Sequence, residues 1–118
     1  MDIRKGDIVF VDNPFQPPHG AVICGSRPAV VIQNNKGNEY SNNIIVAYLT
    51  SQLKRIEMTT HVILQWYPGL KKTSMVQAEQ IATISKSDVT CVIDHLRPED
   101  QVRVDQAIKA SLALEEVS

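Results

Sequence analysis

Residues 44–49, Ile44-Ile45-Val46-Ala47-Tyr48-Leu49, form a nearly continuous apolar run near the middle of the sequence. The run is short for a helix, and its β-branched and aromatic members favour a strand. Because apolar and polar residues do not alternate along it, we predict that a strand over residues 43–51 is buried on both faces. The other predicted elements lie before and after this strand.

Four further strands are predicted outward from this run. Residues 8–11 and 28–32 precede it, and a 14-residue loop, 13–26, lies between those two segments. A loop of that length in a small domain is more often functional than incidental. Residues 61–65 and 73–84 follow the run, the latter as one long strand or a bent pair. On a regular strand, one face of 73–84 carries alternate residues: Ser74, Val76, Ala78, Gln80, Ala82 and Ile84.

Three shorter segments lie between or after these strands. Residues 34–38 are rich in asparagine and predict a turn. Residues 85–88 have the spacing of a capping box and predict a short helical turn. Val92 and Ile93 then either extend that turn or form a small strand.

The C-terminal segment has the pattern of a helix. Pro98 is followed by two acidic residues, a combination that favours a helix start. Val104, Ile108 and Leu112 then repeat at helical spacing, which predicts a helix to about residue 117. Five or so strands followed by one helix predict a mainly β fold with some α, a small barrel or twisted sheet closed by the helix.

Length and composition limit the class of protein. The 118 residues suit a single domain, 1–118, and 43% hydrophobic with 21% charged residues is ordinary for a globular chain. The net charge of −1 gives no overall sign of a nucleic-acid partner. The charge is divided unevenly, however, because residues 1–72 carry a net charge of +3 and residues 73–118 carry −4.

The cysteines and the N-terminus indicate the compartment. Cys24 and Cys91 are too few for a disulfide framework and lack zinc-site spacing, so we expect two free, buried or half-buried thiols. The start of the sequence has no apolar signal core, and no apolar run is long enough to span a membrane. We therefore expect a cytoplasmic protein with no bound metal, no cofactor and no membrane contact.

Two strand ends carry side chains suited to a phosphate. Arg27 follows Gly25-Ser26 and precedes Pro28, at the end of the long loop. A guanidinium there is either an exposed charge or a bidentate phosphate ligand. Thr50 and Ser51 end the central strand. A set of basic residues follows, which either is a solvated surface or borders the same groove as Arg27: Lys54, Arg55, Lys71 and Lys72.

The three histidines give a weaker indication of chemistry. His61 and His95 lie on predicted packed segments, where a structural role is the simpler interpretation. His19 lies in the long loop and is a stronger catalytic candidate because imidazole titrates near neutral pH.

Taken in order, these segments resemble the MazF/PemK family of toxin endoribonucleases from type II toxin–antitoxin systems. The resemblance covers nearly the whole chain, and its motifs are modest singly but specific together. The matching stretches are residues 4–10 (RKGDIVF), 27–34 (RPAVVIQN), 45–52 (IVAYLTSQ), 60–62 (THV), 74–81 (SMVQAEQI) and 111–114 (SLAL).

The resemblance implies an SH3-like small β-barrel with a C-terminal helix, working as a homodimer that a cognate antitoxin neutralises. It also implies metal-independent cleavage of single-stranded RNA, such as mRNA, leaving a 2′,3′-cyclic phosphate and a 5′-hydroxyl. A DNA contact is expected only for the toxin–antitoxin complex. The family's catalytic arginine and threonine fall on Arg27 and Thr50. Further RNA contacts are assigned to Asn34, Ser51, Ser74, Gln80, Lys54 and Lys72.

The chemistry of these residues fits that activity. Attack by the ribose 2′-hydroxyl builds negative charge on phosphorane oxygens, which Arg27 can stabilise while Thr50 donates a hydrogen bond. Because the pKa of a guanidinium lies far above neutral pH, an arginine is a poor base, so charge stabilisation is its main expected role. His19 is one possible acceptor of the 2′-hydroxyl proton. The alternative is a non-catalytic SH3-like binding module for nucleic acid or a partner protein.

The loop before Arg27 departs from the family pattern. Residues 16–24 are more apolar than the family's Gly-, Ser- and Glu-rich loop and contain no acid. This difference bears on the recognised RNA sequence more than on the chemistry. Single-stranded bases are read partly by stacking, for which Phe15, Tyr48 and Trp66 are candidates, each with a core or interface position as the alternative.

Overall fold

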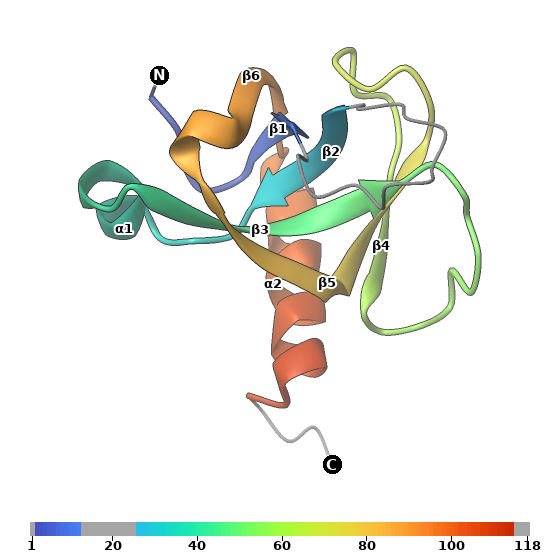
Figure 1. Cartoon of the computed structure of the whole chain (residues 1–118). Helices are drawn as coiled ribbons and strands as arrows, with labels where there is room; N and C mark the ends of the chain where they lie inside the picture. Colours follow the sequence, from blue (N-terminus) through green and yellow to red (C-terminus); the bar gives the residue numbers. More distant parts are fainter. Residues whose placement is uncertain (1, 13–25, 115–118) are drawn as a thin grey trace, which may run out of the picture.

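The strand built from the apolar run, β3 (Asn43–Thr50), lies inside an antiparallel sheet between β2 (Ser26–Val31) and β5 (Ser74–Ser85). The computed structural model describes residues 2–12 and 26–114. The remaining elements are β1 (Asp7–Asp12), α1 (Asn35–Tyr40), β4 (His61–Leu64), the 3-10 turn η1 (Lys86–Asp88), β6 (Val89–His95) and α2 (Pro98–Leu112). The strand order is β4-β5-β3-β2-β1-β6, and α2 crosses one face of the sheet (Figure 1).

Alternate residues of β3 point into two different apolar clusters. Ala47 and Leu49 belong to a helix-side cluster, which α2 covers: Ile8, Val30, Ala47, Leu49, Val62, Leu64, Tyr67, Val76, Ala78, Leu96, Val104 and Ala107. Ile44 and Val46 belong to an inner cluster: Ile3, Val9, Val11, Ala29, Val31, Ile44, Val46 and Val89. The prediction that this strand is buried on both faces is therefore confirmed.

β5 is bent by a bulge. Leu49 pairs with Val76 and Ala47 pairs with Ile81, so residues 77–80 lie opposite Tyr48 alone. Between these two pairs β3 advances by two residues and β5 by five. Because five is odd, the even-numbered residues of β5 face one side of the sheet before the bulge and the other side after it. Val76 and Ala78 consequently pack in the helix-side cluster, and Ala82 and Ile84 pack against the inner cluster. The predicted single face for these residues is wrong for this reason, and the segment is one long strand, Ser74–Ser85, that bends at the bulge.

The bent sheet confirms the predicted small, barrel-like β fold with a C-terminal helix. Its edges are β4 and β6, and no ladder between them occurs within the described ranges. The loop after β4 nevertheless reaches β6, because the Gly69 N–H donates to Asp94 Oδ2 at 3.0 Å. A β-carbon on Gly69 would collide with the Ile93 carbonyl, so only glycine permits this close approach.

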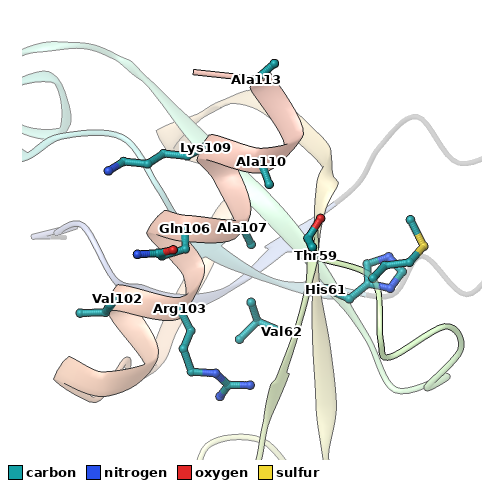
Figure 2. A pocket seen from close by; sticks show the side chains of 11 residues that line it. Thr59, His61, Val62, Val102, Arg103, Gln106, Ala107, Lys109, Ala110 and Ala113 are labelled. Carbon is teal, nitrogen blue, oxygen red and sulfur yellow. The ribbon is translucent and has the colours of Figure 1, made fainter. Parts of the chain in front are cut away.

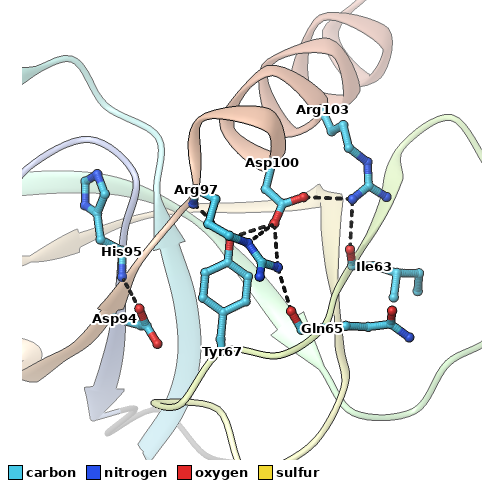
Figure 3. A network of polar contacts seen from close by, with 8 residues as sticks. All are labelled: Ile63, Gln65, Tyr67, Asp94, His95, Arg97, Asp100 and Arg103. Atoms are coloured by element: carbon cyan, nitrogen blue, oxygen red, sulfur yellow. Dashed lines mark hydrogen bonds and ion pairs between the residues drawn. The ribbon is translucent and has the colours of Figure 1, made fainter.

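A polar network fixes the start of α2 to the sheet (Figure 3). We call it the α2 anchor, and it consists of Tyr67, Arg97, Asp100 and Arg103. The buried Asp100 carboxylate accepts hydrogen bonds from the Tyr67 hydroxyl at 2.6 Å and from Arg103 Nη1 at 2.9 Å. Arg97 donates to the same carboxylate and to the Gln65 carbonyl, the latter at 2.6 Å. These bonds compensate the burial of a charge beneath the first turn of the helix.

Burial alone would raise the pKa of Asp100, but the hydrogen bonds from Tyr67, Arg103 and Arg97 outweigh it and hold that pKa below its usual value. For Tyr67, burial and the bond to Asp100 raise the pKa of the phenol.

Three expectations about the elements are corrected by the structure, and the small-strand alternative for residues 92–93 is confirmed. Residues 35–40 form α1 instead of a simple turn, because the Asn34 side chain caps the helix and buried Asn38 bonds to Gln33. The 92–93 segment is part of β6, since β1 supplies a pairing edge. α2 ends at Leu112, where Ala113 adopts a left-handed conformation, φ 53°. Cys91 is exposed on edge strand β6 and not buried, while Cys24 lies outside the described residues.

Candidate active site

Arg27 and Thr50 lie on neighbouring strands at the same end of the sheet. The β2–β3 ladder pairs Ala29 with Tyr48, and two further steps of that register place Arg27 opposite Thr50 on the same face. The Arg27 guanidinium stacks on the Tyr48 ring, with its carbon 4.4 Å from the ring centroid. The ring therefore supports a half-buried cation on β2, and continuation of the ladder register predicts that Thr50 is its neighbour on β3.

The Thr50 hydroxyl has an orientation suited to donation. Its Oγ1 accepts a hydrogen bond from the Gln52 N–H at 3.1 Å, so the hydroxyl proton is available to a second group. Thr50 pairs with Met75 of β5, which is buried and fixes the strand end. An anion placed against this end of β3 would meet both a guanidinium and a hydroxyl donor.

Arg27 also keeps its charge available. Within the described parts of the chain, no carboxylate forms an ion pair with it, and its contact is the Tyr48 ring. A ring supports the cation without neutralising it. Tyr48 was a candidate base-stacking residue in the sequence, and the structure uses its ring to hold Arg27.

The bulge of β5 brings Gln80 to the same region. Gln80 is the last residue of the bulge opposite Tyr48, and it is exposed. Arg27, Tyr48, Thr50 and Gln80 therefore surround one surface patch, which we call the Arg27–Thr50 site.

Three of the other predicted RNA contacts lie on the loops around this end of the sheet. Ser51 and Lys54 are exposed on the loop that follows Thr50. Lys72 is exposed on the loop that leads into β5, whose second residue pairs with Thr50. These positions fit the predicted basic border, and their contacts with RNA stay predictions.

Ser74 and Asn34 have different surroundings. Ser74 is buried, and its hydroxyl donates to the Lys72 carbonyl at 3.1 Å. Asn34 caps α1 through its Oδ1, which accepts from the Gly37 N–H at 2.8 Å. Figure 1 shows α1 at the opposite end of β3 from the loop that follows Thr50. The structure therefore does not bring Asn34 to the Arg27–Thr50 site within one chain, about 20 Å of strand separating the two.

The other candidates for base stacking and for acid–base chemistry either lie in surroundings that the structure defines or fall outside the described residues. Trp66 is 85% exposed with a positive φ of 66°, so it is not a core residue. His95 accepts or donates at Nδ1 with Asp7 Oδ1 at 2.7 Å, on the β1–β6 side. Phe15 and His19 lie outside the described residues.

His61 has a more specific environment than its position in the sequence indicated. Its ring is 6% exposed and bridges the Arg55 carbonyl and the Glu79 carboxylate. Glu79 lies 18 residues from His61, so no local motif could have shown the bridge.

A large hollow lies elsewhere, between α2 and the start of β4 (Figure 2). It has a volume of about 790 Å³ and is walled by Thr59, His61 and Val62 on one side and by Ala107 and Ala110 of α2 on the other. Among residues 2–12 and 26–114, no three His, Cys, Asp or Glu side chains are arranged to hold a metal ion. None of the described helices is long and apolar enough to cross a membrane.

Known proteins resemble this chain in sequence and in structure. Endoribonuclease EndoA of Bacillus subtilis is 39% identical over 115 residues, which are 97% of each protein. An endoribonuclease from a mycobacterial species, solved in complex with its cognate antitoxin, superposes with a TM-score of 0.80 at 19% identity, covering 97% of this chain and 98% of that one. MazF from Deinococcus radiodurans superposes with a TM-score of 0.76 at 18% identity, covering 96% and 98%.

The two structural matches establish the fold, and the matches in sequence establish the family. Residues 4–112 match the family described as the PemK-like, MazF-like toxin of type II toxin–antitoxin systems. This range includes every strand, both helices and the whole Arg27–Thr50 site. The chain therefore belongs to the MazF/PemK family of toxin endoribonucleases.

Proposed function

We propose that this endoribonuclease cleaves single-stranded RNA, including mRNA, without a metal ion or cofactor, and that Arg27 and Thr50 act directly on the reacting phosphate. The observation that carries the proposal is the placement of the Arg27 guanidinium, supported by Tyr48, on the same face as the Thr50 hydroxyl. A phosphodiester at this patch would receive a positive charge from one strand and a hydrogen bond from the next.

The proposed reaction is an internal transfer. The ribose 2′-oxygen attacks the adjacent phosphorus, a new O2′–P bond forms, and the P–O5′ bond breaks. Solvent takes the proton of the 2′-hydroxyl and supplies one to the 5′-oxygen, and the products carry a 2′,3′-cyclic phosphate and a 5′-hydroxyl. No water is consumed in this step, and Arg27 and Thr50 are proposed to align the phosphate and stabilise charge.

Arg27 acts chiefly as the charge stabiliser. Negative charge grows on the nonbridging oxygens in the transition state, and a preorganised donor there is worth on the order of 3 kcal/mol. The planar guanidinium can reach two phosphate oxygens at once. The Tyr48 ring holds it without a competing carboxylate among the described residues, so its charge remains available to substrate.

Thr50 donates the second hydrogen bond. Because Oγ1 already accepts from the Gln52 N–H, the hydroxyl proton is directed to another acceptor, here a nonbridging oxygen. Gln80, Ser51, Lys54 and Lys72 are proposed to contact the bases or phosphates on either side. Ser74 is a proposed contact that needs a change at its present hydrogen bond, and Asn34 is a proposed contact at the other end of β3.

The partners and the location are also proposals. We propose that residues 1–118 act as one domain in the cytoplasm, that the chain forms a homodimer, and that a cognate antitoxin protein neutralises it. The resemblance to an endoribonuclease solved with its cognate antitoxin supports the last point. A mass measurement in solution at micromolar concentration tests the dimer directly.

The test is to incubate the purified chain with a long single-stranded RNA in EDTA. We expect discrete fragments that end in a 2′,3′-cyclic phosphate, and their loss in Arg27→Ala and Thr50→Val. Thr50→Ser keeps a hydroxyl and should retain most activity. The matched control is Arg4→Ala, because Arg4 is an exposed arginine away from Thr50.

The competing function is a binding module on the same fold. Tight binding of RNA that stays intact in EDTA and in magnesium would overturn the proposed cleavage and favour that function.

A further inference from the structure

His61 is held by two hydrogen-bond acceptors. It is the first residue of β4, and its side chain is 6% exposed. Nδ1 lies 2.9 Å from the Arg55 carbonyl oxygen, and Nε2 lies 2.8 Å from Glu79 Oε2. Each ring nitrogen therefore has one close oxygen partner.

These two contacts define the protonation state of the ring. A backbone carbonyl and an ionised carboxylate can only accept hydrogen bonds. Both bonds form together only if both ring nitrogens carry a proton, which makes His61 an imidazolium. A neutral ring would turn one unprotonated nitrogen toward an oxygen lone pair.

The electrostatics agree with this geometry. Burial lowers the pKa of His61, but the hydrogen bonds to Glu79 and to the Arg55 carbonyl outweigh it, so the net pKa is raised. Burial raises the pKa of Glu79, and the bond from His61 reverses that effect and leaves it lowered. Both pKa shifts therefore favour protonated His61 beside ionised Glu79.

Each oxygen belongs to a segment that borders the Arg27–Thr50 site. Arg55 lies in the loop that follows Thr50 and has a left-handed φ of 51°, a conformation that costs about 1 kcal/mol or more for a residue with a β-carbon. Its carbonyl also accepts from the Met58 N–H at 3.1 Å. Glu79 lies in the bulge of β5 next to Gln80. His61 therefore joins the loop after one site residue to the bulge that carries another.

We propose that His61 is a positioning residue of the endoribonuclease, whose imidazolium holds the Thr50 loop and the β5 bulge at a fixed separation around the RNA. This inference rests on the proposed function. Loss of one of the two bonds would let the loop or the bulge move by a fraction of an ångström or more, and misplacement of that size can reduce a rate by about 10- to 100-fold.

The charged groups around His61 come from three elements. Glu79 of β5 makes the direct contact. Lys54 and Arg55 lie on the preceding loop, and Arg103 and Lys109 of α2 line the hollow that His61 also lines. Among the described residues, the Glu79 carboxylate is the charged group that contacts the ring, and it favours the protonated form.

The first measurement compares kcat/KM for a short single-stranded RNA. His61→Gln supplies a donor for one partner but cannot reach both, so we expect about a tenfold loss, mainly in kcat. The matched control is His95→Gln, because His95 also pairs with a carboxylate, Asp7, but on the β1–β6 side. His95→Gln should cleave at the wild-type rate. All rates are expressed per folded molecule.

The second measurement is the pH profile, which a merely structural role would not move. Cleavage by the wild-type chain should decline as pH rises through the raised pKa of His61. Glu79→Gln keeps an oxygen acceptor but removes the charge, so its profile should decline at lower pH than the wild-type profile. Ring ¹⁵N spectra should show both His61 nitrogens protonated at neutral pH.

Three results would overturn the inference: wild-type cleavage by His61→Gln, superimposed pH profiles for wild type and Glu79→Gln, or a neutral His61 ring at neutral pH. Failure of the proposed function is recognised separately, because wild type and His95→Gln would then both leave RNA intact.

Discussion

Two arginines in this chain stack on tyrosine rings at almost the same distance, and their roles differ. The Arg97 guanidinium lies 4.2 Å from the centre of the Tyr67 ring, and Arg27 lies 4.4 Å from that of Tyr48. Arg97 also donates to the Asp100 carboxylate and to the Gln65 carbonyl. Arg27 has no such acceptor among the described residues.

The difference separates the structural Arg97 from Arg27, the proposed catalytic residue. At the α2 anchor, the aromatic ring, the carboxylate and the carbonyl together satisfy the cation, so it contributes to folding. At the Arg27–Thr50 site the ring orients the cation and leaves its donors unsatisfied, so a phosphate can use them. Both arginines stack on a tyrosine ring, and they differ in that Arg97 is also paired with the Asp100 carboxylate.

The largest expected effect is on RNA cleavage, and it distinguishes the two arginines. Arg27→Ala should reduce RNA cleavage by about 10²- to 10³-fold, because a transition-state donor is lost. Its thermal unfolding midpoint should stay near wild type. Arg97→Ala should instead lower that midpoint and keep cleavage per folded molecule. Calorimetry together with gel-based cleavage measures both, and the comparison breaks if Arg27→Ala unfolds first or Arg97→Ala is the inactive variant.

The second effect concerns the buried carboxylate of the α2 anchor. Asp100→Asn should lower the free energy of unfolding by about 2 kcal/mol at neutral pH, since hydrogen bonds to a charged group are weakened. The lowered pKa of Asp100 means that its contribution is complete above the ordinary value of 3.8 and is lost as pH falls through the lower value in the folded chain. Urea unfolding at pH 6 and in more acidic buffers should show the two proteins converging. A constant difference across that range would exclude the ionised carboxylate as its source.

A smaller effect is expected at the basic loops beside the Arg27–Thr50 site. Lys54→Glu combined with Lys72→Glu should weaken RNA binding and flatten its dependence on salt, by a slope of about 0.7 for each phosphate of the single strand that the variant no longer neutralises. Fluorescence anisotropy with an uncleavable RNA at several salt concentrations measures this slope. Lys36→Glu is the control, because Lys36 is exposed on α1 at the other end of β3. Equal slopes for the wild type and the double variant would remove these loops from the site.

The smallest effect is expected at Trp66, which lies between two residues used by the α2 anchor. Its left-handed φ of 66° suits glycine, and its side chain is 85% exposed. Trp66→Gly relieves backbone strain but increases the entropy of the unfolded chain, so the free energy of unfolding should change by less than about 1 kcal/mol. A larger loss in a thermal or urea scan would mean that the indole packs within the anchor.

The sequence contained enough information for the strands and for the positions of the two proposed catalytic residues at strand ends. The β-branched run at 44–49 predicts β3 because such a run must be covered on both faces, and the apolar clusters cover it. Pro98 predicts the start of α2, because its fixed φ suits the first helical position. Arg27 and Thr50 follow from the family resemblance and from their positions at strand ends.

Other features depend on contacts between distant residues. α1 contains Gly37 and Asn38, which are weak helix formers, and it forms because the Asn38 side chain bonds to Gln33. The helix α2 ends at Ala113 without the usual glycine signal. The bridge made by His61 joins Arg55 to Glu79 across 24 residues of sequence, and only the pairing of β4 with β5 brings them together.

The bulge of β5 gives this enzyme a place where its length can change without refolding. The two halves of β5 are held in register separately, one by β4 and the end of β3 and the other by the start of β3. An insertion between Glu79 and Gln80 would be absorbed locally, and both ladders would stay intact. We expect a one-glycine insertion there to shift which RNA sequences are cut while leaving the unfolding midpoint close to wild type, which sequencing of cleavage products and a thermal scan would test. Relatives that differ here could acquire new targets on an unchanged scaffold.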